Sequence, residues 1–114
     1  MASNGVDLTQ KKCVACESGM PPLAREEALI LMKQITGWTL SGDSRWISKE
    51  FKFKDFAEAL SFTDKVGAIA EAEGHHPDIQ LSWGKVTLEL TTHAIKGLSE
   101  NDFIIAAKVD KLQS

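Results

Sequence analysis

The chain has three histidines, and all of them lie between positions 75 and 93. Imidazole is the side chain that both gives and takes a proton near neutral pH. Carboxylates flank the group, since Glu71 precedes His75 and Asp102 follows His93. Residue types of this kind in one short span indicate general acid–base chemistry on a bound substrate.

The three histidines are expected to meet in space. Gly74 is predicted to end a helix in the left-handed conformation that favours glycine, so His75 and His76 follow a helix C-terminus. These two residues then begin one strand of a predicted hairpin, and His93 ends the partner strand. In a tight hairpin the start of the first strand lies beside the end of the second. We therefore predict one site containing His75, His76 and His93.

A metal site is the alternative use of these side chains, because three histidines can hold a catalytic zinc ion. Adjacent residues of an extended chain point to opposite sides, so His75 and His76 would not both reach one ion. No cysteine or aspartate completes a ligand set at the usual spacing. Acid–base catalysis is favoured, and no metal or cofactor is expected.

Three further residues have both a structural and a functional interpretation. Asp102 stands three residues after Ser99, which is the spacing of a capping box at a helix start. Glu71 falls in the last turn of a predicted helix, where the helix dipole disfavours a carboxylate, so contact with a histidine would explain it. Trp83 is either an aromatic wall of the site or part of the hairpin core, and we expect the core.

The elements that position these residues follow the order αββαββα. Helix start and stop signals predict helices over residues 24–34, 56–73 and from 99 onward. Alternation of apolar and polar residues predicts strands over 38–40, 45–53, 78–83 and 86–92. Hairpin connections imply a four-stranded antiparallel sheet with three helices on one face, an α+β fold.

Two details of this fold are also predicted. In the helix over 56–73, an apolar stripe is expected to face the core, widened by Phe62 and Ile69. Its main members are Phe56, Ala59, Leu60, Thr63, Val66, Gly67 and Ala70. The strand over 45–53 is expected to lie at an edge of the sheet and to offer a surface for pairing with a second copy.

Length and composition indicate one globular domain. The chain has 114 residues, a hydrophobic fraction of 43% and a net charge of −3. There is no basic cluster and no long apolar run, so partners among nucleic acids or membranes are not expected. The N-terminus lacks the features of a signal peptide, and a cytoplasmic location is expected.

Residues 1–22 have no clear period and are predicted to be an N-terminal tail or arm, leaving residues 23–114 as the domain. The tail holds the pair Cys13 and Cys16. One pair supplies only two of the four ligands of a structural zinc site. A redox motif would be expected beside a βαβ unit, which is not predicted here. The two thiols are interpreted as having no chemical role.

The pattern Glu-x3-His-His-Pro-x5-Trp-x9-His-x8-Asp, from Glu71 to Asp102, resembles the signature of the pterin-4a-carbinolamine dehydratases. The resemblance extends more loosely from about Leu23 to the C-terminus, and Lys-Lys-Cys-x-x-Cys resembles plant- and protist-type members. It implies a hydro-lyase that converts a 4a-hydroxytetrahydropterin into the quinonoid dihydropterin and water. The implied fold, three helices against a four-stranded antiparallel sheet, agrees with the fold predicted from the residues.

The resemblance also implies roles for individual residues. His75 and His93 are the implied acids, and His76 is assigned to substrate binding or to the base. Gly74 and Ala94 replace acidic residues of many relatives, so only their backbone groups would take part. The implied substrate-binding set is Glu71, Gly74, Pro77, Trp83, Thr91, Thr92, Ala94 and Asp102.

A homodimer or homotetramer is implied as well, and the pathway is tetrahydrobiopterin recycling or a related one. The alternative is a protein-binding module, because some relatives act as dimerisation cofactors of a transcription factor. A scaffold of that kind would tolerate loss of the histidines, whereas an enzyme would not.

Overall fold

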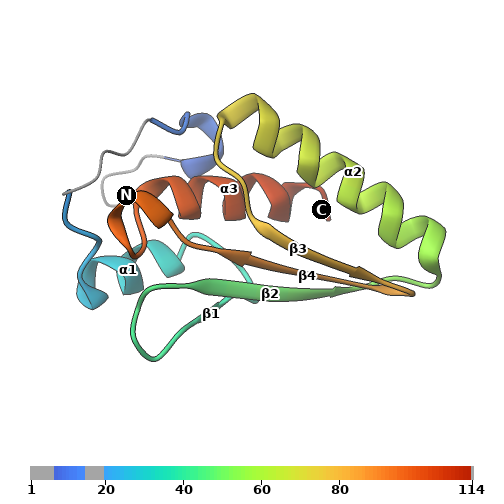
Figure 1. The fold of residues 1–114 in the computed structure, drawn as a ribbon, viewed down its shortest axis with the longest axis horizontal. Coiled ribbons are helices and arrows are strands. Elements are labelled where there is room, and N and C mark those ends of the chain that lie inside the picture. The colour runs from blue at the N-terminus through green and yellow to red at the C-terminus, as the bar shows by residue number, and fades with distance from the viewer. Residues whose placement is uncertain (1–6, 15–19, 114) are drawn as a thin grey trace.

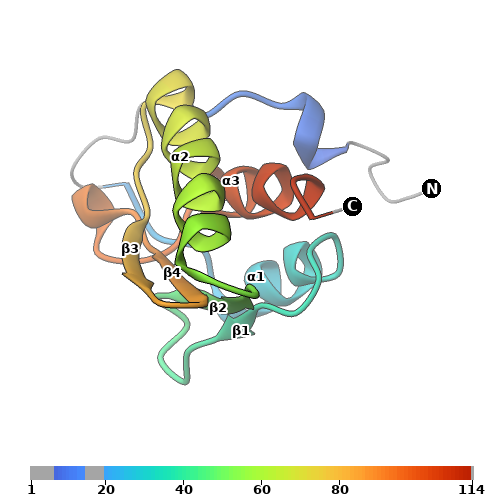
Figure 2. The ribbon, with the colours of Figure 1, turned by 90° about the vertical axis from the view of Figure 1, so that its right-hand side faces the viewer.

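The computed structural model describes residues 7–14 and 20–113, which form one antiparallel sheet covered by helices (Figure 1). The sheet order is β1-β2-β4-β3, and every neighbouring pair is antiparallel. The strands are β1 (Thr39–Leu40), β2 (Ile47–Lys52), β3 (Asp78–Ser82) and β4 (Lys85–Leu90). The helices lie on one side of the sheet (Figure 2): α1 (Arg25–Met32), α2 (Phe56–Glu73) and α3 (Glu100–Lys111). The predicted α+β fold and element order are confirmed.

Local sequence explains where α2 begins and ends. The Asp55 side chain accepts a hydrogen bond of 2.9 Å from the backbone N–H of Glu58, which caps the first turn. Gly74 ends the helix with φ +66°, a left-handed conformation that strains other residues. The predicted bounds of this helix, 56–73, agree with the structure.

The core lies between the inner face of the sheet and the helices. Alternate residues of β4, namely Val86, Leu88 and Leu90, are fully buried. On β2, Ile47 is also fully buried and Phe51 is 2% exposed. Helix α3 is buried along most of its length, from Asn101 to Ala107. It is therefore the central helix, and residues in its first turn are held rigidly.

One predicted detail of the fold is wrong, and another agrees in part. Strand β2 lies inside the sheet, because β4 pairs along its whole length, and the edges are β1 and β3. On α2 the buried residues are Ala59, Phe62, Val66 and Ala70, all of which were expected to face the core, whereas Phe56 and Leu60 are each 42% exposed. Which apolar residues of α2 are buried depends on the angle at which the helix crosses the sheet, and that angle cannot be predicted from the sequence of the helix.

The described part of the N-terminal segment packs against the domain. A short 3-10 helix, η1 (Leu8–Gln10), lies on α3, and Leu8 is only 1% exposed. The aliphatic side chain of Leu8 thus joins the main core. The division of the chain at residue 22 stays a prediction. Cys13 is partly buried, and Cys16 lies outside the described residues.

Among the described residues, no helix is long and apolar enough to cross a membrane.

Candidate active site

The three histidines come from two connections at the same end of the hairpin. The backbone N–H of His75 donates to the carbonyl of Ala70, so the chain leaves α2 immediately after Gly74. At the other connection, β4 runs into a second 3-10 helix, η2 (His93–Ile95). The pairing of Asp78 with Glu89 places the start of β3 beside the end of β4.

A cavity of about 410 Å³ lies where these connections meet, and we call it the histidine cavity. Its lining is mostly polar, with two threonines and an asparagine beside the imidazoles. The lining residues are Val14, Gly74, His75, His76, Thr91, Thr92, His93, Ala94 and Asn101. The predicted convergence of His75, His76 and His93 is therefore present in the structure.

His75 is held by a buried carboxylate. Its Nε2 lies 2.6 Å from Oδ1 of Asp102, and the two side chains are 12% and 0% exposed. The other oxygen of Asp102 accepts hydrogen bonds from the hydroxyl of Thr92 (2.8 Å) and from the backbone N–H of Ser99 (3.0 Å). Asp102 thus caps α3 and orients the ring of His75 at once through Nε2.

His76 makes a similar bond in a different setting. Its Nε2 lies 2.6 Å from Oε2 of Glu71, but the side chains are 58% and 80% exposed. Water competes for both groups, so this pair restrains the ring only weakly. The expectation that Glu71 contacts a histidine agrees with this geometry.

His93 is positioned by an aromatic ring. Trp46 meets it edge to face, with ring centroids 5.8 Å apart and an interplanar angle of 79°. Within residues 7–14 and 20–113, no hydrogen bond to the ring of His93 is present. A second cavity of about 210 Å³ lies on the other side, lined by Arg45, Trp46, Thr91, His93 and Lys96. His93 therefore stands between two cavities.

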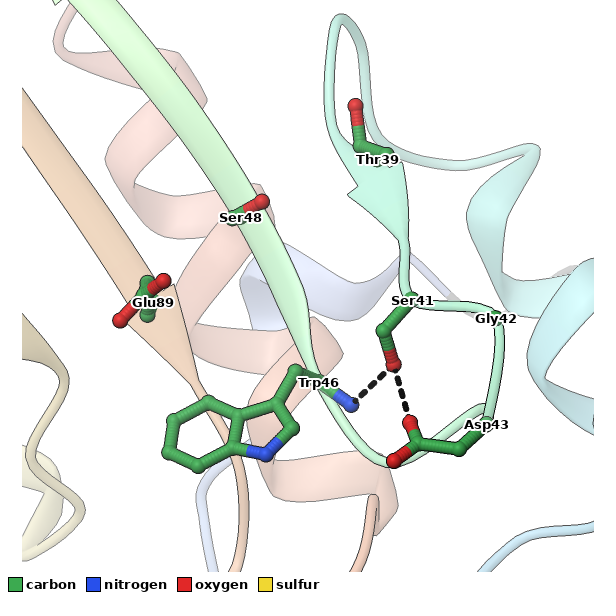
Figure 3. Close-up of a pocket in the computed structure, with 7 residues that line it drawn as sticks. All are labelled: Thr39, Ser41, Gly42, Asp43, Trp46, Ser48 and Glu89. Atoms are coloured by element: carbon green, nitrogen blue, oxygen red, sulfur yellow. Dashed lines mark hydrogen bonds between the residues drawn. The ribbon is translucent and has the colours of Figure 1, made fainter.

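The loop before β2 sets the position of Trp46 (Figure 3). The hydroxyl of Ser41 accepts a hydrogen bond from the backbone N–H of Trp46 (3.1 Å) and donates to Oδ1 of Asp43 (2.6 Å). These bonds to Ser41 and to the backbone N–H of Arg45 lower the pKa of Asp43. The indole borders an open hollow of about 480 Å³ on the outer face of the sheet, which also includes Thr39, Ser48 and Glu89.

Apart from Trp83, the other predicted binding residues either line the histidine cavity or stand beside it. Gly74, Thr91, Thr92 and Ala94 line the histidine cavity, whereas Glu71 and Pro77 stand next to lining residues without lining it themselves. The hydroxyl of Thr91 donates to the carbonyl of Arg45 (2.6 Å) and that of Thr92 to Asp102, so both hydroxyls have partners within the protein.

Trp83 lies far from the cavity and outside the core. It is 71% exposed in the turn between β3 and β4, so the expectation that it belongs to the hairpin core is wrong. A strand rises about 3.4 Å per residue, which puts Trp83 roughly 20 Å from the histidines. An aromatic wall at the site is equally inconsistent with this position.

Three residues of the site were not selected by sequence analysis. The alternation of apolar and polar residues over 45–53 puts Trp46 on the polar face of the strand, and only the contact with His93 shows its place. Asn101 precedes Asp102 on α3 and could have been noticed for that reason. Val14 lies more than fifty positions from the nearest histidine in sequence, and no local signal indicates it.

The described residues contain no group of three or more His, Cys, Asp and Glu side chains arranged to hold a metal ion. His75 and His76 instead bond to two separate carboxylates. The divergence of adjacent imidazoles predicted from extended backbone agrees with this arrangement.

A family model described as pterin 4 alpha carbinolamine dehydratase matches residues 21–112, which is most of the chain. The chain belongs to this family. A protein of Alkaliphilus metalliredigens, provisionally named a pterin-4-alpha-carbinolamine dehydratase, is 52% identical over 109 residues, covering 95% of this chain and 97% of the relative. A protein of Methylococcus capsulatus with the same provisional name is 50% identical and covers 92% of each chain. These relatives support pterin dehydratase, and hence lyase, chemistry.

Two solved structures share the fold of this dehydratase family member. One is described as a transcriptional coactivator/pterin dehydratase from Brucella melitensis; it superposes with a TM-score of 0.77 at 29% identity, covering 82% of this chain and 99% of that one. The other is described as a pterin dehydratase-like protein that is a RuBisCO assembly factor, with a TM-score of 0.58 at 28% identity, covering 67% and 88%. The same fold thus occurs in proteins described by an enzymatic and by a protein-binding role.

Proposed function

We propose that this chain dehydrates a 4a-hydroxytetrahydropterin by histidine acid–base catalysis. The observation that carries the proposal is the meeting of His75, His76 and His93 at one cavity in a chain of this family. The cavity also offers backbone groups at Gly74 and over residues 91–94 for the polar edge of a pterin. The hydroxyls of Thr91 and Thr92 are engaged within the protein, and so are the backbone N–H groups of Gly74 and Thr92, so we assign the polar edge of the pterin to the other backbone groups of this segment.

The reaction is an elimination that needs two proton transfers. The C4a–O bond breaks, and the leaving hydroxyl takes a proton and departs as water. The N5–H bond also breaks, and its electron pair forms the C4a=N5 double bond of the quinonoid product. One proton is given and one is taken, so the catalyst returns to its starting state without any covalent intermediate.

The geometry supports different assignments for the three imidazoles. His75 and His93 approach the cavity from different connections, so we assign them as the acids that serve the two sides of C4a. His76, exposed and loosely held by Glu71, is assigned to substrate binding or to the removal of the N5 proton. Asp102 and Trp46 position His75 and His93 without contacting the substrate. The pathway we propose is tetrahydrobiopterin recycling or a related pterin route.

An oligomer belongs to the same proposal. Large apolar side chains remain exposed on three elements: Leu29 and Ile30 on α1, Phe56 and Leu60 on α2, and Ile79 on the edge strand β3. Burying such surface between copies is favourable, and a homodimer or homotetramer would do so. Sedimentation at micromolar concentration distinguishes these states from a monomer.

A protein-binding role is the second candidate, favoured by the descriptions of the two solved structures. One experiment separates it from catalysis: dehydration of a synthetic 4a-hydroxytetrahydropterin by the wild-type chain and by the double variant His75→Ala/His93→Ala. We expect turnover by the wild type that varies with pH across the range where histidines titrate, about 5.5 to 8. We expect the double variant to be folded and inactive. Equal activity of the two proteins would remove the acid–base mechanism and leave the protein-binding role.

A further inference from the structure

The N-terminal segment reaches the histidine cavity, although nothing in the sequence connects the two. Residues 11–14, here called the strap, cross the start of α3 and the end of α2. Lys11 pairs with Glu100 on α3 (2.7 Å), and the backbone N–H of Cys13 donates to Glu73 at the end of α2 (2.9 Å). The strap is therefore attached to the two elements that position His75.

Val14 ends the strap and is held by the buried side chain of Asn101. The amide of Asn101, a residue 4% exposed, accepts from the backbone N–H of Val14 (3.0 Å) and donates to its carbonyl (2.6 Å). Asn101 directly precedes Asp102, which holds His75. The position of Val14 relative to the imidazole is thus set within one turn of α3.

Leu8, three residues before the strap begins, anchors the chain that leads into it. The side chain of Leu8 is 1% exposed and belongs to the main core, and its backbone N–H faces the side chain of Gln34 at 3.4 Å. Leu8 is six residues before Val14 and does not line the histidine cavity. It can influence the cavity through the path of the strap or through α3, on which η1 lies.

The chemistry of the strap at the cavity is apolar. Asn101 pairs with both backbone polar groups of Val14, and this residue is 69% exposed and lines the cavity, so we infer that it meets the cavity with its isopropyl group. The other lining side chains are mainly imidazoles, hydroxyls and an amide. A flat heteroaromatic substrate has polar edges and apolar faces, and the isopropyl group suits a face.

We propose that the strap is a wall of the substrate site and that Val14 contacts the bound ring, with Asn101 and Leu8 as positioning residues. This inference rests on the proposed dehydratase function. It extends the substrate site to the segment that sequence analysis assigned to a tail, and it assigns Val14 to substrate affinity and not to proton transfer.

The test is steady-state dehydration kinetics on the full chain. Val14→Ala removes two methyl groups from an exposed side chain, so the fold is retained. We expect KM to rise about tenfold with kcat unchanged, on the scale of one lost apolar contact. The matched control is Ile30→Ala, another exposed aliphatic residue (57%) that lines no part of the cavity. Because Ile30 belongs to the surface proposed for assembly, both variants are compared after sedimentation shows the wild-type oligomeric state, and the KM of Ile30→Ala should then equal that of the wild type.

The positioning role is tested at Leu8. Leu8→Ala should raise KM in the same direction while kcat is kept, and Leu8→Met, which refills the space, should restore the wild-type KM. Combining Leu8→Ala with Val14→Ala should raise KM no further than Val14→Ala alone, because the strap acts through Val14. Should Leu8→Ala fail to fold, Val14→Ala and its control still decide the inference.

The outcomes separate this inference from the proposed function. An active wild type with an unchanged KM in Val14→Ala overturns the strap as part of the site and leaves the dehydratase function intact. A wild type without dehydratase activity overturns the proposed function, and the inference with it. A raised KM in Ile30→Ala as well would show a general effect of lost apolar surface and would also overturn the inference.

Discussion

His75 and His76 are neighbours in sequence, and each places Nε2 at 2.6 Å from a carboxylate oxygen, yet the two pairs differ in kind. The His75–Asp102 pair is nearly or completely removed from water, and Asp102 has two further donors. The His76–Glu71 pair is largely exposed, and no other group from the described part of the chain joins it. Equal distances thus describe one ring that is locked and one that is loosely restrained.

The difference follows from burial. In water, an exposed ion pair gains little, because solvent screens the charges and two flexible side chains must be ordered. A buried carboxylate must instead find a partner for each lone pair, and removing one partner leaves the others unsatisfied. The first pair should therefore control the geometry of catalysis, and the second should adjust affinity.

The largest effect is expected from Asp102→Asn. The amide oxygen can still accept from the backbone N–H of Ser99 and the hydroxyl of Thr92, but the NH2 group then faces Nε2 of His75 and can pair only with the tautomer that has no proton on that nitrogen. Turnover should fall by a factor of about 10²–10⁴, because the tautomer and orientation of an acid–base group are lost. The free energy of unfolding should fall by about 1–3 kcal/mol.

Kinetics and thermal unfolding of the same samples provide the check. A capping role alone would cost about 1 kcal/mol and leave turnover per folded molecule unchanged. That result would show that the contact with His75 has no catalytic purpose.

Substitution of His75 and of His76 by alanine is the next comparison. His75→Ala should lower kcat by about 10²–10⁴ while KM changes little, since a positioned acid is lost. His76→Ala should mainly raise KM, because its ring is exposed and weakly held. Measurements of kcat and KM for both variants decide this, and a larger kcat loss in His76→Ala would reverse the assignment of the two rings.

Acid unfolding extends the comparison to a third carboxylate. Glu73 is 7% exposed, pairs with Lys108 and accepts from the backbone N–H of Cys13, and these contacts lower its pKa. A lowered pKa gives stability that is present above the ordinary value of 4.5 and is lost as pH falls through the folded-state pKa. Glu73→Gln should thus melt below wild type near pH 7, and the two melting temperatures should converge below pH 4.5.

The control is Glu50→Gln. Glu50 pairs with Lys52 at the surface, where the side chain is 45% exposed. The hydrogen bond to Lys52 also lowers the pKa of Glu50, but solvent screens this exposed pair, so the melting temperature of Glu50→Gln should follow that of the wild type at every pH. A constant difference between Glu73→Gln and wild type across the acid range would contradict the linkage.

The smallest effect is expected from Glu71→Gln. The change in unfolding free energy should stay below about 1 kcal/mol, as for other exposed pairs. KM should rise slightly, because His76 loses its restraint. Titration with salt sharpens the point: increasing ionic strength should remove the difference in KM between wild type and variant. A large loss of stability would mean that the exposed pair resembles the buried one after all.

The sequence by itself determined the helices and strands, and it determined at which end of the fold the histidines meet. Asp55 and Gly74 set the bounds of α2, because capping and left-handed backbone are local properties of those residues. Period-two alternation identified the strands, and short turns made them hairpins. From the hairpin it followed that His93 lies near His75 and His76, since antiparallel pairing fixes which ends meet.

Tertiary structure alone decided the features that depend on distant segments. The sheet order placed β2 inside, because pairing between β2 and β4 is not local. Trp83 lies exposed in the turn between β3 and β4. Packing buried Asp102 against His75 and left Glu71 exposed to solvent, although nothing in the sequence distinguishes the burial of the two carboxylates. The core captured Leu8 and so brought Val14 to the histidine cavity. Each of these depends on how elements pack across the chain, and no local pattern encodes that packing.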